Sequence, residues 1–287
     1  MATPLTADAL VNALTAEGLN IVEYGDWRNH NRNTKGAWGP VNGVIVHHTV
    51  TSATVDSVAL CYDGYTDLPG PICHGVIAKD GTVHLVGNGR ANHAGSGDAD
   101  VLAAVIAETA LPAPDQNNTD GNTHFYGFEC VNLGDGSDPW PEAQLEAVAR
   151  VSAAICRAHG WHAASVIGHL EWTDQKIDPK GFSMASMRSR VTALLAAAPG
   201  GSATRYQPFP GAAFFTAAPR STIVAAMGGR LIAEGCSAYT DGPGPQWSEA
   251  DRASYALWQQ KLGYTGADAD GWPGAGSWTA LQVPYTA

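Results

Sequence analysis

The sequence predicts an α/β fold in which helices flank a central β-sheet, followed by a small and mainly helical domain. Short strand patterns alternate with helical patterns up to about residue 198. Small and structure-breaking residues follow, and the remaining segment carries mostly helical patterns. We therefore expect a first domain over 1–198, a linker over 199–204 and a second domain over 205–287.

Five short segments of the first domain have the composition of strands. Residues 42–47 are almost continuously apolar, as in a strand that is buried on both faces. Residues 75–78 and 82–86 flank the pair Asp80-Gly81, which favours the tight turn of a β-hairpin. The other strand-like runs are 125–131 and 165–168.

Helices are predicted from the spacing of apolar residues and from their end signals. Near the N-terminus, Thr6 is a candidate N-cap and Gly18 a stop. Residues 141–159 carry apolar side chains at helical spacing, and Gly160 ends the pattern. Further helical patterns cover 184–198, 223–234 and 248–262, and a short one opens at 277.

The charge balance disfavours some classes of partner. The net charge is −11, with 11 basic and 21 acidic residues in 1–198 and 5 and 6 in 199–287. Nucleic-acid binding relies on neutralisation of phosphates by Lys and Arg, so this acidic balance argues against it, and against adhesion to anionic lipid.

Two further features bear on localisation. No apolar run approaches the roughly 18 residues that suggest a membrane span, so we expect no membrane insertion. The N-terminus lacks the basic start of a secretory signal. We expect the protein to stay in the cytoplasm until another protein releases it.

The five cysteines are scattered and contain no CxxC pair, which argues against a cysteine-rich zinc site. Cys130 and Cys156 lie in apolar patterns, so we expect them in the core. Cys61 and Cys73 flank a loop rich in Gly and Pro, and would be able to pair in an oxidising compartment. Reduced thiols are the alternative.

Three residues of metal-ligand type occupy suggestive positions. His47 ends the predicted strand 42–47, His169 follows the strand at 165–168, and Asp178 comes nine residues later. A catalytic zinc ion takes three protein ligands and an open fourth position, which two imidazoles and a carboxylate would satisfy. A histidine at a strand end can also be structural, and Asp178 before Pro179 can be a turn residue.

Glu129 lies between Phe128 and Cys130 in an otherwise apolar strand pattern. Burying a carboxylate is costly unless the group is paired or its pKa rises. Glu129 is therefore either a salt-bridged or edge residue, or a general base beside metal-activated water. Lys176 is either a solvated surface lysine or a cation that stabilises an oxyanion.

Five motifs occur in order along the first domain. They are Val44-Ile45-Val46-His47-His48-Thr49, the run His74 to Val83, Asn92-His93-Ala94-Gly95, Gly127-Phe128-Glu129, and Gly168-His169 with Lys176-Ile177-Asp178-Pro179. Together they resemble the type 2 N-acetylmuramoyl-L-alanine amidases, whose fold is shared with peptidoglycan recognition proteins. The resemblance covers roughly residues 20–195 and implies a central mixed β-sheet flanked by helices.

The resemblance implies one zinc ion held by His47, His169 and Asp178. It further implies that Glu129 is the catalytic acidic residue and Lys176 the catalytic basic residue. Residues that would contact substrate are His48, Thr49, Asn92 and His93. The alternatives are that His48 packs in the interior and that His93 stabilises its loop.

Two positions depart from the family pattern. Cys73 stands where many relatives carry a tyrosine, so Glu129 rather than a tyrosine would have to assist the water. Asp178 stands where several relatives carry a cysteine, and a carboxylate is also a suitable zinc ligand.

The second domain resembles, more loosely, small helical peptidoglycan-binding domains. The matching stretches are Leu257-Trp258-Gln259, Asp268 to Gly274, and Ser277-Trp278. Trp258, Trp272 and Trp278 would then either fill the small core or stack on sugar rings of the cell wall.

These resemblances imply a zinc-dependent hydrolase of bacterial peptidoglycan that cuts between the lactyl group of muramic acid and L-alanine. With no secretory signal and a wall substrate, the chain is similar to phage endolysins, which are bacteriolytic and reach the wall through a separate holin. A host autolysin or wall-recycling enzyme is the nearest alternative. Alternatives from other classes are a non-catalytic peptidoglycan-binding protein and a zinc peptidase that cuts within the stem peptide.

Overall fold

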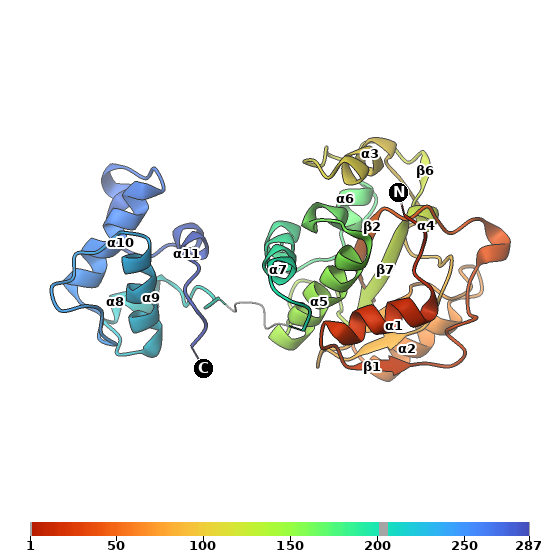
Figure 1. The fold of residues 1–287 in the computed structure, drawn as a ribbon, viewed down its shortest axis with the longest axis horizontal. Helices are drawn as coiled ribbons and strands as arrows, with labels where there is room; N and C mark the ends of the chain where they lie inside the picture. The colour runs from red at the N-terminus through yellow and green to blue at the C-terminus, as the bar shows by residue number, and fades with distance from the viewer. Residues whose placement is uncertain (1, 201–205, 287) are drawn as a thin grey trace. The chain divides into compact units, whose positions relative to one another are not determined.

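The computed structural model describes residues 2–200 and 206–286 (Figure 1). The chain divides into two compact units, Met1–Ala203 and Thr204–Ala287. Most of the predicted linker, residues 201–204, lies outside the described residues. Within the described ranges, no helix combines the length and the apolar character that a membrane crossing needs.

A mixed six-stranded β-sheet forms the centre of the first unit, as predicted. Its strand order is β1-β4-β3-β7-β2-β8. Strands β3, β7, β2 and β8 run parallel, whereas β3 and β4 form the predicted antiparallel hairpin. The strands are β1 (Ile21–Glu23), β2 (Gly43–His48), β3 (Gly75–Ile77), β4 (Val83–Leu85), β7 (Phe125–Cys130) and β8 (Val166–Gly168).

Helices cover both faces of this sheet. They are α1 (Ala7–Ala16), α2 (Thr54–Asp63), α3 (Ala99–Ala107), α4 (Gly121–His124), α5 (Glu142–His159), α6 (His169–Trp172) and α7 (Met184–Ala196). Helices α5 and α7 lie side by side (Figure 1). Smaller elements are the 3-10 turns η1 (Asn33–Lys35) and η2 (Ala163–Ser165) and the two-stranded sheet of β5 (Ser96–Gly97) and β6 (Thr119–Asp120).

The alternation of side chains along β2 assigns the helices to the two faces. Val44 and Val46 pack in the large core that includes residues of α1, α5 and α7. Ile45 points to the other face and packs with residues of α3 and with Trp172 of α6. On that second face, β3 is covered by α2 through a small cluster that includes Val58 and Val76.

The predicted helix ends are largely confirmed. Thr6 caps α1, and its hydroxyl accepts a hydrogen bond from the Ala9 N–H. Gly160 follows α5 with φ 71°, a left-handed conformation that glycine adopts without strain. Helix α7 ends at Ala196, two residues before the predicted end.

All five cysteines are free and buried thiols. Cys130 and Cys156 lie in the core, as predicted. Cys61 and Cys73 share the cluster beneath α2. Burial raises the pKa of Cys73 well above its usual value, and a hydrogen bond with Cys61 adds to the rise. The structure therefore has these two residues in the reduced form that the sequence left as one of two possibilities.

The parallel strands β7, β2 and β8 end at the same edge of the sheet. His47 of β2 is the register partner of Glu129 in β7, and Val46 is the partner of Gly168 in β8. The carboxyl edge of parallel strands is the usual place for ligand sites in open α/β sheets. Pairing of these strands thus brings together segments that are distant in sequence.

The second unit is mainly helical, as predicted. Its elements are α8 (Ala212–Thr216), α9 (Thr222–Ala233), α10 (Glu249–Lys261), η3 (Gly266–Ala269) and α11 (Ala275–Leu281). Ser248 caps α10 in a capping box with Asp251, which confirms the predicted helix start. The apolar core contains Phe215, Met227, Leu231 and Tyr255.

Candidate active site

Three side chains of metal-ligand type converge at the carboxyl edge of the sheet. His47 lies at the end of β2, His169 begins α6 directly after β8, and Asp178 follows in the next loop. The Nδ1 atoms of His47 and His169 are 3.0 Å apart, and Asp178 Oδ2 lies 3.1 Å from each of them. All three residues are buried. The fold therefore assembles the donor set that the sequence singled out.

Hydrogen bonds behind the two imidazoles fix their tautomers. His169 Nε2 lies 3.3 Å from the Ala94 carbonyl oxygen, which can only accept, so Nε2 carries the proton. His93 Nε2 likewise donates to the Phe125 carbonyl at 3.1 Å. His93 Nδ1 therefore accepts a hydrogen bond from His47 Nε2 at 3.1 Å. When the two rings are neutral, the Nδ1 atoms that face Asp178 therefore carry a lone pair.

The electrostatic setting acts on the protonation of His47 and Asp178. Burial and the nearby His169 lower the pKa of His47 to about 4. Burial opposes ionisation of Asp178, whereas hydrogen bonds from His169 and His47 lower its pKa when these rings donate from Nδ1. Neutral imidazoles and a carboxylate are the forms that bind metal ions. Three electron-rich atoms this close repel one another unless a cation lies between them, so the donor set fits a metal ion.

A sequence profile of the N-acetylmuramoyl-L-alanine amidases matches residues 37–181, which are 145 of the 287 residues. The chain belongs to the N-acetylmuramoyl-L-alanine amidase family. It is an enzyme that acts on peptidoglycan, at the amide bond between muramic acid and L-alanine. No curated protein sequence matches this amidase.

Similar solved structures include amidases and endolysins. The endolysin amidase LysCS from Clostridium intestinale is 16% identical, with 60% of this chain and 95% of that chain covered and a TM-score of 0.40. The amidase AmiD from E. coli is 14% identical, with 88% and 91% covered and a TM-score of 0.40. The Ph2119 endolysin from a Thermus scotoductus bacteriophage is 16% identical, with 60% and 99% covered and a TM-score of 0.39. The family assignment rests on the sequence match.

Glu129 lies next to the donor set in the amidase. Register partners on parallel strands project from the same face, so Glu129 points to the side of the sheet that carries His47. The residue is half-buried, but its Oε2 atom is buried and has no hydrogen-bond partner among the described residues. Burial raises the pKa of Glu129 to about 8, with Asp178 adding to the rise and Lys176 opposing it. Within the described residues Glu129 forms no salt bridge, so the paired-carboxylate alternative is not observed.

Lys176 is an exposed residue in the loop that precedes Asp178. In the described part of the chain, no hydrogen bond or ion pair holds its ammonium group. Its charge still opposes the rise in the pKa of Glu129 and helps to lower the pKa of His47, so it acts on the site. An unpaired cation beside a reactive carboxylate suits stabilisation of negative charge.

Cys73, where many relatives have a tyrosine, is fully buried. Its raised pKa keeps the thiol protonated at neutral pH. Cys73 is therefore a poor candidate for proton transfer beside the donors.

His48 and Thr49 are held by the protein itself. The ring of His48 is buried, and its Nδ1 accepts a hydrogen bond from the Lys180 N–H at 3.3 Å. Gly134 packs so close that a Cβ there would lie 2.2 Å from His48 Nε2. Thr49 Oγ1 accepts from the Asn132 N–H at 3.3 Å. The structure thus gives both residues a packing role, and their contact with substrate stays a prediction.

His93 and Asn92 belong to a loop that supports the site. His93 is buried behind His47 and positions that ring, rather than lying open to the solvent. The Asn92 amide donates to the Pro69 carbonyl at 2.8 Å. Asn122, which the sequence did not single out, organises this loop because its Oδ1 accepts hydrogen bonds from the N–H groups of His93 and Ala94. Nothing in the sequence around Asn122 marks that role.

The tryptophans of the second unit differ in their exposure. Trp258 and Trp278 are 5% and 2% exposed and belong to the core, so neither offers a ring face to a sugar. Trp272 is half-buried. It stacks on Trp247 at 5.6 Å between centroids, and the Arg252 guanidinium lies 4.9 Å from its ring centroid. The core-filling interpretation therefore describes Trp258 and Trp278.

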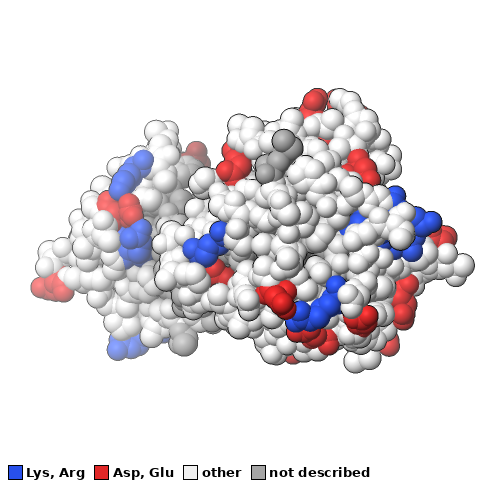
Figure 2. Space-filling model, turned by 45° about the vertical axis from the view of Figure 1, so that its right-hand side comes forward, with Lys and Arg blue, Asp and Glu red and all other residues white. Residues whose placement is uncertain are grey.

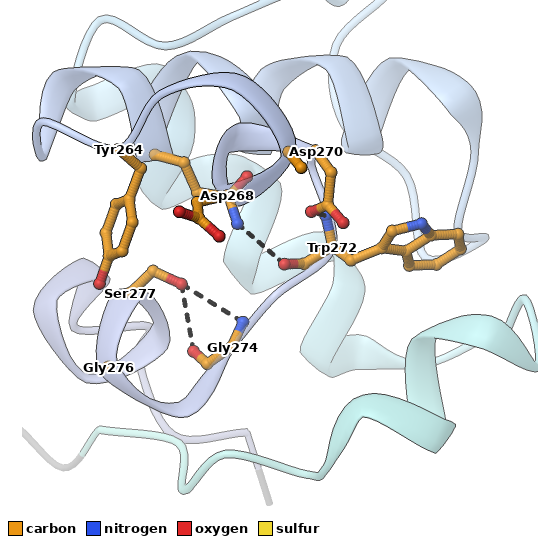
Figure 3. A pocket seen from close by; sticks show the side chains of 9 residues that line it. Tyr264, Asp268, Asp270, Trp272, Gly274, Gly276 and Ser277 are labelled. Carbon is orange, nitrogen blue, oxygen red and sulfur yellow. Dashed lines mark hydrogen bonds between the residues drawn. The ribbon is translucent and has the colours of Figure 1, made fainter.

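A cavity of about 270 Å³ opens in the second unit beside Trp272. Figure 3 shows the carboxylates of Asp268 and Asp270 between Tyr264 and Trp272. Gln259 Nε2 donates to the Trp272 carbonyl at 2.9 Å, and Ser277 Oγ accepts from the Gly274 N–H at 3.3 Å, so hydrogen bonds hold the walls (Figure 3). The cavity is lined by Gln259, Tyr264, Ala267, Asp268, Asp270, Trp272, Gly274, Gly276 and Ser277.

Proposed function

We propose that the amidase is zinc-dependent and that His47, His169 and Asp178 hold one zinc ion. The observation that supports this most is the triangle of unprotonated donors, with sides of 3.0 and 3.1 Å. Ligands at about 2.0–2.1 Å from a tetrahedral zinc ion lie roughly 3.3–3.4 Å from one another. The three donor atoms would therefore need to move apart only slightly to hold the ion. Three protein ligands leave the fourth coordination position free.

The residues around the donors suit amide hydrolysis. When bound, zinc would supply Lewis-acid activation of water and of the scissile carbonyl. Glu129, whose pKa a bound divalent cation would lower, would take the proton of the attacking water on Oε2 and return it to the leaving amine of L-alanine. Lys176 would stabilise negative charge on the lactyl carbonyl oxygen. His93 would keep His47 in the ligating tautomer.

Two substitutions test this assignment. We expect Asp178→Ala to lose both zinc and activity, because only two ligands remain. Glu129→Gln should keep zinc and lose about 100-fold or more of the turnover, because the amide cannot take the proton. Asp174→Asn is the matched control, since Asp174 is an exposed aspartate four residues from Asp178. Metal analysis and kinetics on a soluble muramyl peptide give the result; a zinc-replete Asp178→Ala or a fully active Glu129→Gln would refute it.

The biological role that we propose is that of a phage endolysin. It is supported by the amidase assignment together with a second unit whose sequence resembles wall-binding domains. Such an enzyme, made inside the cell, would need a holin to reach the wall. Expression in a bacterial host with and without a pore-forming protein tests this. Lysis only in the presence of the pore is expected, and lysis without it would favour an autolysin.

The second unit would bind peptidoglycan, and the cavity beside Trp272 is the concave surface that it offers. Gly276 lies at its wall in α11, and a Cβ there would come 3.6 Å from the Tyr264 hydroxyl. We expect Gly276→Leu to fill the cavity and to reduce retention of the protein on purified walls. Gly229→Leu in α9 is the matched control, because nothing lies within 4 Å of that position. Equal retention of both variants would exclude the cavity as the binding site.

A further inference from the structure

Val50 has a backbone conformation that its residue type disfavours. Its φ is 56°, in the left-handed region, where the branched Cβ of valine clashes with the backbone. Glycine would adopt the same conformation freely. The side chain is also 66% exposed, so packing in the core does not explain why a valine stands here.

Hydrogen bonds on both sides impose this conformation. The Thr49 N–H donates to the Cys130 carbonyl at 3.0 Å, which ties the end of β2 to β7. The Thr51 hydroxyl donates to Thr49 Oγ1 at 2.7 Å and lies 2.5 Å from Ser57 Oγ in α2. The chain must therefore turn sharply at Val50. Strain that the surrounding structure enforces in this way is typical of functional sites.

Val50 lies close in sequence to the reaction centre. It follows the ligand His47 by three residues at the carboxyl edge of the sheet, in the loop that is tied to the end of the Glu129 strand. Ile177, which directly precedes the ligand Asp178, is 65% exposed. Two large apolar side chains thus face solvent in the loops that flank a polar and buried donor set.

The substrate of the amidase has matching apolar groups. The scissile amide carries the lactyl methyl on its carbonyl side and the L-alanine methyl on its amine side. Neither methyl group can be recognised by the imidazoles, the carboxylates or Lys176. An exposed aliphatic side chain beside the donors is the kind of group that would bury a methyl.

We propose that Val50 is a specificity-determining residue that contacts the methyl group of L-alanine, and that Ile177 extends this apolar contact. The proposal rests on the placement of the reaction centre at His47, His169 and Asp178. The left-handed backbone would fix the direction of the exposed isopropyl group, at a position where a glycine would fold more easily but bind no methyl group.

The test compares the full-length, zinc-loaded enzyme with Val50→Gly on two soluble muramyl peptides, with L-alanine or glycine at the first stem position. We expect the wild-type enzyme to prefer the L-alanine substrate by about 10-fold in kcat/KM, because a single methyl group supplies that much discrimination. Val50→Gly should lose most of this preference through a higher KM for the L-alanine substrate. Its Tm should rise by about 2–4 °C, because the strain is relieved.

Further variants separate recognition from folding. Val50→Asn tolerates the left-handed backbone without supplying an apolar group, so it should show the same kinetic pattern. Val55→Ala is a control at an 80% exposed valine, and Ala218→Gly relieves a φ of 48° in the second unit; both should keep wild-type kinetics. A Val50→Gly enzyme with wild-type selectivity would overturn the proposal and leave the amidase assignment intact. If the wild-type enzyme hydrolyses neither substrate, the Val50 proposal and the amidase assignment are both overturned.

Discussion

At the scale of single residues, the carboxyl group of Glu129 lies in surroundings that disfavour its charged form. Its pKa of about 8 compares with the usual 4.5. In the metal-free protein, the folded state keeps a proton that the unfolded chain releases between these two values. Stability linked to Glu129 is therefore present below about pH 4.5 and is lost as the pH rises toward 8.

We therefore expect the chelated wild-type protein to lose stability relative to Glu129→Gln between about pH 5 and pH 8. The difference should be roughly 2–4 kcal/mol, less than the full shift because Glu129 is partly exposed. A divalent cation lowers the pKa of a neighbouring acid, so zinc should reduce the difference. Urea unfolding at a series of pH values measures it, and parallel stability curves for the two chelated proteins would contradict the assignment.

The sequence predicts single residues where chemistry restricts the choice. His47, His169 and Asp178 could be found because few residue types bind a metal, and the structure brings the three together. The support of His47 by His93, and of the His93 loop by Asn122, depends on contacts between segments far apart in the chain. No local pattern encodes such contacts. The strain at Val50 likewise arises from hydrogen bonds that only the folded chain forms.

At the scale of elements, β7 contacts the support of the proposed metal site through a glycine. A Cβ on Gly127 would lie 2.3 Å from His93 Cγ and Nδ1. We expect Gly127→Ala to displace His93 from His47 and to lower zinc affinity by about 10–100-fold without altering a ligand. Gly229→Ala in α9 is the control, because it meets no neighbour and removes a helix glycine.

Zinc titration of Gly127→Ala and Gly229→Ala measures the zinc affinity of each variant. Tm is measured in parallel to detect general unfolding. Wild-type affinity in a folded Gly127→Ala protein would show that His93 does not act on His47.

Helices and strands with a strong residue pattern and clear end signals could be predicted from the sequence, whereas very short ones could not. Strand β2, the hairpin β3–β4 and helix α5 have strong patterns, and the structure contains them. Helix α6 was not predicted because four residues are too few to show a period. Helix α3 (Ala99–Ala107) was also missed: its sequence is apolar almost throughout, so its buried face does not stand out.

At the scale of the whole molecule, the two units carry different charge. The first segment, 1–198, has 11 basic and 21 acidic residues, a net charge of −10, while 199–287 has 5 and 6, a net of −1. On the face drawn in Figure 2, acidic and basic side chains are interspersed. A nearly neutral second unit would approach an anionic cell wall with less repulsion than the catalytic unit.

We expect the fragment 1–200 to keep amidase activity on a soluble muramyl peptide, because the donors and the core of the first unit lie within it. On insoluble walls it should lose retention, and its rate should fall most at low enzyme concentration. Co-sedimentation with purified peptidoglycan and kinetics on both substrates measure this. Unchanged retention of the fragment would place wall binding in the first unit.

The division into two parts could be predicted from the Pro- and Gly-rich segment near residue 200, because such residues break regular structure. The surface that we propose for wall binding in the second unit could not be predicted in this way. Tryptophans in a small domain serve equally well as core or as contact, and only burial distinguishes the two uses, as Trp258 and Trp278 show.

The proposed zinc-dependent catalysis is tested most directly by digestion of purified peptidoglycan with the metal-loaded enzyme and mass spectrometry of the released fragments. We expect intact stem peptides that begin with a free L-alanine amine, and their release should be abolished by chelation and restored by zinc. A different new amine would indicate a peptidase that cuts within the stem. Binding to the wall without any new terminus, whatever metal is supplied, would contradict the catalytic role of His47, His169, Asp178 and Glu129.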